Sequence, residues 1–141
     1  MGHLPTGVVV VASPGPVGTA IGSFSSLSLE PPLVLFSITK TSSSWPKIRA
    51  TGVFCVSVLA EDQEHVSRAF AQSGADKFAG IGYKPMATGS PRIDDCVAWV
   101  DCEIAGIHDG GDHDIVVGSI REIGIEREVK PLIFFRGGYG V

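Results

Sequence analysis

The chain has 141 residues, of which 44% are hydrophobic and 18% are charged, and its formal net charge is −4 at pH 7. This composition excludes a disordered chain, and the length predicts one domain over residues 1–141. Scattered Lys and Arg residues exclude a basic surface for nucleic acid or an anionic membrane, and no apolar run approaches the ~20 residues of a membrane-spanning helix. Three cysteines at irregular spacing and a start without secretion-signal features predict a cytoplasmic protein.

Short β-branched runs separated by 18 glycines and nine prolines predict a mainly β chain. The expected strands are Val8–Ala12, Ala20–Phe24, Leu33–Ile38, Val53–Val58, Val97–Ile107, Ile115–Ile123 and Leu132–Phe135. The strands Val8–Ala12 and Leu33–Ile38 are apolar at consecutive positions, so both of their faces need cover, from a barrel interior and from a helix or partner subunit. The strand from Val97 alternates instead, which puts Cys102 on one face and Asp101 on the other.

Two helices are expected between these strands. The first follows Ser44, with Pro46 tolerated in its first turn and Gly52 as its C-terminal stop. The second begins near Asp62, which is a suitable N-cap residue. The stretch of residues 73–95 is a long connection rich in Gly, Pro and Lys, and connections of this length in compact domains usually have a function.

Two clusters of small and hydroxyl side chains point to a ligand site. The segment Gly18–Ser28 combines glycines with serines before the Pro31-Pro32 stop, and Thr41–Ser44 precedes the first expected helix. Such segments leave backbone N–H groups and hydroxyls accessible, which suits a flat ligand with polar edges and a phosphate. The serines at the helix start are the better phosphate candidates, because a helix N-terminus favours anions. Ordinary turn and capping serines explain the same pattern on composition alone.

The stretch around residues 108–114 has the composition of a metal site, since it contains His108, Asp109, Asp112, His113 and Asp114. Gly110 and Gly111 between these residues instead predict an exposed hairpin turn. We therefore expect no bound metal and interpret His113 as a residue that lies at a strand entry.

The cysteines predict no nucleophile. Cys55 and Cys102 lie in apolar strands and are expected to be inert core thiols. Cys96 follows Asp94 and Asp95, whose negative charges should raise the pKa of its thiol and lower its reactivity.

In this order, the motifs resemble those of the flavin reductase domain family, the small FMN-binding split-barrel proteins that reduce flavin with a nicotinamide cofactor. The family's strand-turn-strand motif matches Gly18, Thr19 or Ala20, Ser23, Phe24, Ser26, Ser28, Pro31 and Pro32, and its hydroxyl cluster matches Thr41, Ser42, Ser44 and Pro46. Further matches are Gly74-Ala75-Asp76-Lys77-Phe78, Gly111-Asp112-His113 and the strand Pro131 to Phe135. The resemblance covers essentially the whole chain.

The resemblance implies a single antiparallel Greek-key split β-barrel with two or three short helices, in a homodimer. It implies hydride transfer from NADH or NADPH to FMN or FAD, with the reduced flavin passed to a separate monooxygenase. A second reading is a non-catalytic FMN-binding module or sensor. A related oxidase acting on a vitamin B6 phosphate would need more basic residues than this chain offers.

The resemblance also assigns the site. His113 is expected to position the nicotinamide, together with the Ala75–Phe78 loop, and the Thr41–Ser44 cluster is expected to hold the phosphate. The predicted cofactor-binding residues are Gly18, Thr19, Ala20, Ser23, Phe24, Ser25, Ser26, Ser28, Thr41, Ser42, Ser44, Asp76, Lys77, Phe78 and Tyr139.

Three departures from the family pattern affect this prediction. Many relatives have Asn where this chain has Gly22, which removes one side-chain hydrogen bond to the ligand. Many have Arg where this chain has Ser43, so the phosphate charge is expected to fall on Lys40 or Lys47. Relatives usually begin with a helix ahead of the first strand, and little precedes Pro5 here, so one cover of the barrel is expected to be missing.

Overall fold

The computed structural model describes residues 3–73 and 76–140 and is mainly β, as expected. Every strand pair among these residues is antiparallel. The helices that the structure describes are α1 (Trp45–Thr51) and α2 (Glu64–Phe70). Neither of these two described helices has the length and apolar content needed to cross a bilayer.

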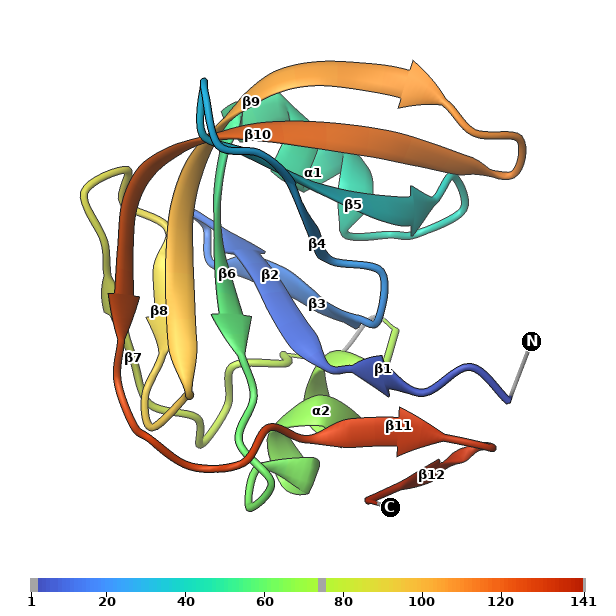
Figure 1. Cartoon of the computed structure of the whole chain (residues 1–141), viewed down its shortest axis with the longest axis vertical. Helices are drawn as coiled ribbons and strands as arrows, with labels where there is room; N and C mark the ends of the chain where they lie inside the picture. The colour runs from blue at the N-terminus through green and yellow to red at the C-terminus, as the bar shows by residue number, and fades with distance from the viewer. Residues whose placement is uncertain (1–2, 74–75, 141) are drawn as a thin grey trace.

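The largest sheet curls around a hydrophobic interior (Figure 1). Its seven strands, in spatial order, are β3 (Val17–Ile21), β2 (Val9–Ser13), β6 (Val53–Val58), β9 (Ala98–Asp109), β10 (His113–Ile125), β5 (Leu33–Thr39) and β4 (Ser25–Ser28). The edge strands β3 and β4 are consecutive in the chain and joined by residues 22–24, so the two ends of the sheet approach each other. Within this link the Ser23 hydroxyl donates to the carbonyl of Ser37 on β5 at 2.7 Å and accepts its N–H at 3.0 Å. The β3 edge itself stays open.

Two smaller sheets complete the described strands. One sheet contains β1 (Thr6–Gly7), β11 (Ile133–Phe135) and β12 (Gly138–Tyr139), and the other is the hairpin of β7 (Tyr83–Pro85) and β8 (Pro91–Ile93). The hairpin falls inside the long connection of residues 73–95, for which the sequence predicted no strand. The short runs Tyr83–Pro85 and Pro91–Ile93 contain prolines, which obscure a strand pattern.

The core has two parts, one on each face of the curled sheet. Phe36, Phe54 and Val116 are buried inside the curl, whereas Phe70 of α2 and Phe78 pack against the opposite face of β2 and β3. All five residues of β2 are buried, so the prediction that this strand is covered on both faces is confirmed. In β5 the cover is complete on one face only, because its residues alternate between buried and partly exposed.

Some predicted boundaries are confirmed, and the others are shifted by one to three residues. Strand β6 has the predicted bounds, and Gly52 is the C-cap that ends α1, with a left-handed φ of 73°. Strand β3 begins three residues before the predicted Ala20 and ends at Ile21, because Ser23 binds β5. Helix α2 begins after Gln63 and not after Asp62, whose carboxylate forms a bidentate ion pair with Arg127 at 2.8 and 3.1 Å.

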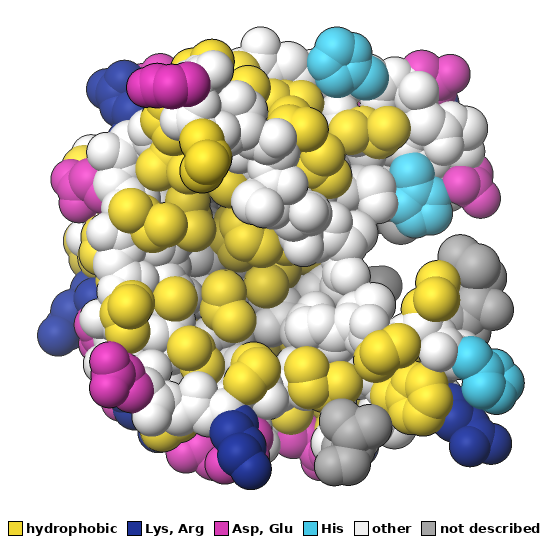
Figure 2. Space-filling model, viewed as in Figure 1, with side chains coloured by type: hydrophobic (Ala, Val, Ile, Leu, Met, Phe, Trp, Pro, Cys, Tyr) yellow, Lys and Arg dark blue, Asp and Glu magenta, His cyan; other side chains and the backbone are white. Residues whose placement is uncertain are grey.

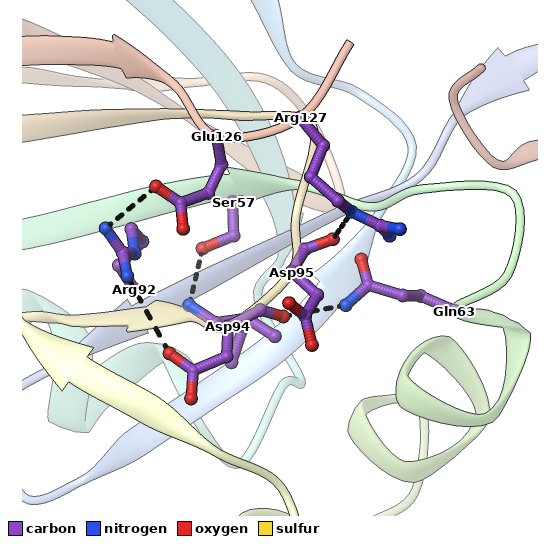
Figure 3. A network of polar contacts seen from close by, with 8 residues as sticks. Ser57, Gln63, Arg92, Asp94, Asp95, Glu126 and Arg127 are labelled. Carbon is purple, nitrogen blue, oxygen red and sulfur yellow. Dashed lines mark hydrogen bonds and ion pairs between the residues drawn. The ribbon is translucent and has the colours of Figure 1, made fainter. Parts of the chain in front are cut away.

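A polar network holds α2 against the turn that precedes β9 (Figure 3). Gln63 donates to the carbonyl of Asp94 at 2.8 Å, and Arg127 donates to the carbonyl of Asp95 at 2.8 Å. Arg92 on β8 is largely buried between Glu126, at 3.3 Å, and Asp94, at 3.7 Å. The network therefore fixes the helix that carries Phe70 and supports β3.

Strand β9 is covered on both faces around Asp101. Val100 and Cys102 on one face belong to the interior core, and the β7–β8 connection covers Asp101 on the other face. Asp101 is fully buried, and its carboxylate accepts the N–H of Thr88 at 3.0 Å and the Thr88 hydroxyl at 2.7 Å. These bonds satisfy the carboxylate and tie the β7–β8 connection to the large sheet.

Gly118 on β10 offers a test of this packing. A Cβ at residue 118 would lie 2.5 Å from Cζ of the fully buried Phe54 and 3.2 Å from Cβ of Cys102. Gly118→Ala should therefore lower the free energy of unfolding by about 1–3 kcal/mol, measured by urea denaturation. Gly7→Ala is the control, because a Cβ at residue 7 has no neighbour within 4 Å. Equal stability of the two variants would contradict this account of the core.

Candidate functional site

An open groove runs along the free edge of β3 and has a volume of about 260 Å³. This edge groove is lined by Thr19, Ala20, Ile21, Gly22, Ser23, Ser37, Ile38, Thr39, Ser42 and His113. Of the predicted site residues, it brings together Thr19, Ala20, Ser23, Ser42 and His113. In Figure 2 the right-hand outline is indented between the β9–β10 hairpin end and the β1 end of the molecule.

The edge groove offers unpaired main-chain groups. The carbonyl of Gly18 points away from β2, because it accepts hydrogen bonds from Lys77 at 3.0 Å and from Ser44 at 3.2 Å. Main-chain groups along an antiparallel strand alternate in direction, so the N–H and carbonyl of Ala20 point to the same open side. A ligand in the groove can therefore bond to β3 as a neighbouring strand would.

A second hollow, of about 370 Å³, adjoins the start of β3. This lysine hollow is lined by Pro14, Gly15, Pro16, Val17, Gly18, Ser44, Lys47, Asp76, Lys77 and Phe78. The Lys77 ammonium donates to the Gly18 carbonyl and to the Ser44 hydroxyl, at 3.0 and 3.1 Å. Burial and the nearby charge of Lys47 lower the pKa of Lys77.

The lysine hollow is suited to an anion. Among residues 3–73 and 76–140, neither Lys47 nor Lys77 forms an ion pair with a carboxylate. Lys40, the other lysine expected to take the phosphate charge, forms an ion pair with Asp109. Lys47 and Lys77 therefore bring positive charge without a carboxylate partner among the described residues to the lysine hollow.

The hydroxyls before α1 already have partners. The Ser42 hydroxyl accepts the N–H groups of Ser44 and Trp45, each at 3.3 Å, so these two groups, which were expected to be offered to a phosphate, already have a partner. Ser44 is buried against Gly18, and the Thr41 hydroxyl lies 3.1 Å from that of Thr39. Of this cluster, Ser42 faces the edge groove and Ser44 faces the lysine hollow.

His113 is the first residue of β10 and pairs with Thr39 of β5. Its Nδ1 lies 2.8 Å from Oδ1 of Asp112, and this hydrogen bond lowers the pKa of the Asp112 carboxyl. The imidazole is half exposed at the wall of the edge groove, with Nε2 left for a ligand. The positioning role of His113 stays a prediction.

Other predicted residues lie outside the edge groove. Phe24 packs against the interior core, and Ser25 and Ser26 are exposed on β4, where Ser28 ends the strand. Asp76, Lys77 and Phe78 line the lysine hollow, away from His113. Gly74 and Ala75 of the same motif lie outside the described residues.

Tyr139 also lies outside the edge groove. Its hydroxyl is 2.8 Å from that of Ser67, and its ring lines a separate hollow with Phe134.

Ile21, Gly22, Ile38 and Lys47 line these spaces and are absent from the predicted list of cofactor-binding residues, and so are two further groups. Ser37 and Thr39 come from β5, and Pro14 to Val17 form the turn before β3. These residues flank the two predicted hydroxyl clusters in the chain, and that proximity is the signal that could have indicated them.

The remaining sequence expectations concern cysteines and metal. Burial raises the thiol pKa of Cys96 to about 11 and that of Cys102 to about 12, and it raises that of Cys55 as well. The predicted direction for Cys96 is confirmed, but burial, and not Asp94 or Asp95, is the main cause. The predicted hairpin at residues 110–112 is also confirmed, and within the described parts of the chain no three metal-binding side chains gather.

Sequence comparisons find relatives that align with nearly the whole chain. A flavin reductase of Pseudomonas putida is 47% identical over 144 residues, which cover 99% of this chain and 85% of the relative. The reductase subunit HsaB of a flavin-dependent monooxygenase from Mycobacterium tuberculosis is 48% identical, over 99% of this chain and 77% of the relative.

Solved structures with the same fold extend the comparison. Nitrilotriacetate monooxygenase component B from Mycobacterium thermoresistibile superimposes with a TM-score of 0.94 at 47% identity, over 99% of this chain and 80% of that one. The NADH:FAD oxidoreductase SgcE6 of Streptomyces globisporus, in complex with NAD and FAD fragments, gives a TM-score of 0.93 at 34% identity, over 99% and 87% of the two chains. The family model of the flavin reductase like domain matches residues 1–141, and the chain belongs to this family.

Proposed function

We propose that this chain is a flavin reductase that transfers a hydride from NADH or NADPH to FMN or FAD. The observation that carries the proposal is the open edge of β3, along which a groove suited to a flat ring adjoins a hollow with two lysines that form no ion pair with a described carboxylate. Family membership and relatives named as flavin reductases support it.

The donor groups of the site fit a flavin. The N–H and carbonyl of Ala20 match the donors and acceptors on the pyrimidine edge of the ring, and the Ser42 hydroxyl adds a polar contact. Lys47 and Lys77 would take the phosphate, which is a charge-assisted contact worth more than a neutral hydrogen bond. The small side chains of Ala20 and Gly22 leave room for close approach to the strand.

A bound flavin would accept the hydride, and the nicotinamide cofactor would supply it. The protein's own contribution is orientation and charge. Backbone N–H groups at the β3 edge are fixed before the reaction and would stabilise negative charge on the pyrimidine side of the ring. His113 would orient the nicotinamide at the groove wall, so that the reacting atoms reach about 3–3.5 Å.

The wider setting of the reaction is also a proposal. Relatives named as reductase components of monooxygenases support a separate monooxygenase that consumes the reduced flavin. The three described cysteines are free and buried, which is consistent with the expected cytoplasmic location.

The direct test of this function is NADH oxidation in the presence of free FMN, followed by absorbance at the nicotinamide and flavin bands under anaerobic conditions. We expect bleaching of the flavin band in step with NADH consumption. Flavin binding without nicotinamide-dependent bleaching would identify a binding module or sensor and contradict the proposal.

His113→Ala tests the positioning role. We expect kcat/KM for NADH to fall roughly tenfold, the effect of losing one good ligand contact, while the Kd for FMN changes less than about twofold. Steady-state kinetics and flavin fluorescence quenching measure the two effects. Full turnover in the variant would remove His113 from the site.

Lys77→Gln tests the phosphate site. We expect the Kd for FMN to rise about tenfold or more, because a charge-assisted contact is lost, while that for riboflavin, which has no phosphate, stays within about twofold. The effect on FMN should shrink in high salt. Lys84→Gln, at an exposed residue of β7, is the matched control. Equal weakening of both flavins would mean that Lys77 supports the protein and not the phosphate.

The homodimer is proposed from exposed hydrophobic surface. Leu29 on the β4–β5 turn is 92% exposed, and Ile123 and Ile125 near the end of β10 are 66% and 72% exposed. In Figure 2, hydrophobic side chains cover much of the face on which β4, β6 and β10 are seen in Figure 1. Surfaces of this kind mark protein interfaces.

Light scattering coupled to gel filtration tests the dimer. The unmodified chain should have the mass of a dimer, and Ile123→Glu with Ile125→Glu should shift it to a monomer, because charges would have to be buried in the interface. Leu4→Glu, at another exposed apolar side chain, should leave the dimer intact. A monomeric wild type would refute the proposal.

A further inference from the structure

Lys77 differs from the other lysines of the chain in its surroundings. Four lysines are exposed, namely Lys40, Lys47, Lys84 and Lys130. Lys77 is partly buried, and it lines the lysine hollow beside the apolar side chains of Val17 and Phe78. Because burial disfavours the charged form of an amine, this location favours a neutral Lys77 more than an exposed location would.

The hydrogen bonds of Lys77 suit a neutral amine as well as an ammonium group. Its Nζ donates to the Gly18 carbonyl at 3.0 Å and to the Ser44 hydroxyl at 3.1 Å, and these are its hydrogen bonds to the described residues. A neutral amine has two N–H groups and one lone pair, whereas an ammonium group has three N–H groups. Loss of one proton therefore costs Lys77 neither bond, and it leaves the nitrogen with a lone pair that no described residue occupies.

A second lysine changes the chemistry of this amine. Lys47, on α1, lines the same hollow, and burial, followed by the charge of Lys47, lowers the pKa of Lys77. The remaining ionisable group of the described lining is Asp76, which accepts the N–H of Phe78 at 3.3 Å and forms an ion pair with neither lysine. A lysine that is both partly desolvated and next to another cation is an activated nucleophile.

The two lysines are suited to an electrophile that has a phosphate group next to its reactive carbon. Lys47 is exposed at the hollow, so it can bind a phosphate through a charge-assisted contact. Because Lys77 lines the same hollow, the reactive carbon would then lie near its nitrogen. The hollow, of about 370 Å³, has room for a small organic phosphate as well as for a phosphate ion. Acyl phosphates have this structure, and phosphate is their leaving group.

We infer that Lys77 is a site of acylation by small acyl phosphates. The Nζ lone pair attacks the carbonyl carbon of the acyl group, and the bond between that carbon and the bridging oxygen breaks. Inorganic phosphate leaves with the electron pair of that bond, beside Lys47, and the nitrogen releases one proton to solvent. The product is an N-acyl-lysine, which is an amide, so no oxidant or reductant takes part.

Acylation would weaken the phosphate site. The amide nitrogen has one N–H group and no charge, so it keeps at most one of the bonds to Gly18 and Ser44. The effect on flavin rests on the proposed function, which places the flavin phosphate beside Lys47 and Lys77. Acetylated protein should therefore bind FMN as weakly as Lys77→Gln does. Bound FMN should in turn shield Lys77 from acylation.

Peptide mass spectrometry of the protein treated with acetyl phosphate tests the site. We expect Lys77 to be acetylated at least about tenfold faster than the exposed Lys84, because a charge-assisted phosphate contact alone is worth about that factor. Acetic anhydride, which has no phosphate, should give a smaller ratio of the two rates. Added inorganic phosphate should slow the reaction of acetyl phosphate with Lys77 and not that with Lys84.

Two variants and a pH series separate the contributions. Lys47→Gln should slow acetylation of Lys77 by acetyl phosphate about tenfold, and that by acetic anhydride less. Arg49→Gln, at an exposed residue of the same helix, should change neither rate. Because a lowered pKa leaves more neutral amine at a given pH, the rate at Lys77 should level off at a lower pH than the rate at Lys84.

The outcomes distinguish this inference from the proposed function. Acetylation of Lys77 that is no faster than that of Lys84, or that Lys47→Gln leaves unchanged, would overturn the inference whether or not the protein reduces flavin. Preferential acetylation of Lys77 that FMN slows and riboflavin does not slow supports both. If acetylation is preferential and saturating FMN gives no protection, the acylation site stands and the phosphate location in the proposed function is wrong.

Discussion

The pairing of β3 with β2, which leaves the other side of β3 open, determines how the site is built. The Lys77 ammonium binds the Gly18 carbonyl and the Ser44 hydroxyl, so it links the loop before β7 to the edge strand and to the start of α1. The pairing of β3 with β2 makes main-chain groups alternate in direction, so the Gly18 carbonyl that Lys77 meets and the main-chain groups of Ala20 point to the same open side. The lysine hollow and the strand edge are therefore two consequences of one strand pairing.

This arrangement depends on tight packing behind the strand. A Cβ at residue 18 would lie 3.1 Å from Phe70 of α2 and 3.3 Å from Phe78, so the absence of a side chain lets both rings reach β3. Phe70 and Phe78 meet edge to face at 4.8 Å, and the polar network of Figure 3 holds the start of α2 in place. Gly18 thus has a structural reason to be glycine, in addition to the part that its carbonyl plays at the site.

The sequence predicted the strands better than the site, for a physical reason. An apolar, β-branched run such as Val53–Val58 predicts a strand whichever strands become its neighbours, and β6 has the predicted bounds. The serines of Gly18–Ser28 depend instead on tertiary contacts: Ser23 binds β5, whereas Ser25 and Ser26 face outward on β4. Hydroxyl groups of the same kind in one short segment therefore have different roles, which composition cannot separate.

The sequence likewise could not show which lysine is available to a phosphate. Lys40 and Lys47 were equal candidates for the phosphate charge, and only the fold shows that Asp109 engages Lys40 while Lys47 stays free beside Lys77. Asp109 lies 69 residues from Lys40 in the chain, so the ion pair depends on the antiparallel pairing of β5, β10 and β9. Spacing in the sequence carries no information about such a contact.

A crystal structure of the protein with FMN bound tests the central claim most directly. The account predicts the flavin ring along the β3 edge, within hydrogen-bond distance of the Ala20 main chain, and the phosphate beside Lys47 and Lys77. A flavin bound elsewhere, or a groove filled by the protein's own side chains at saturating FMN, would contradict it.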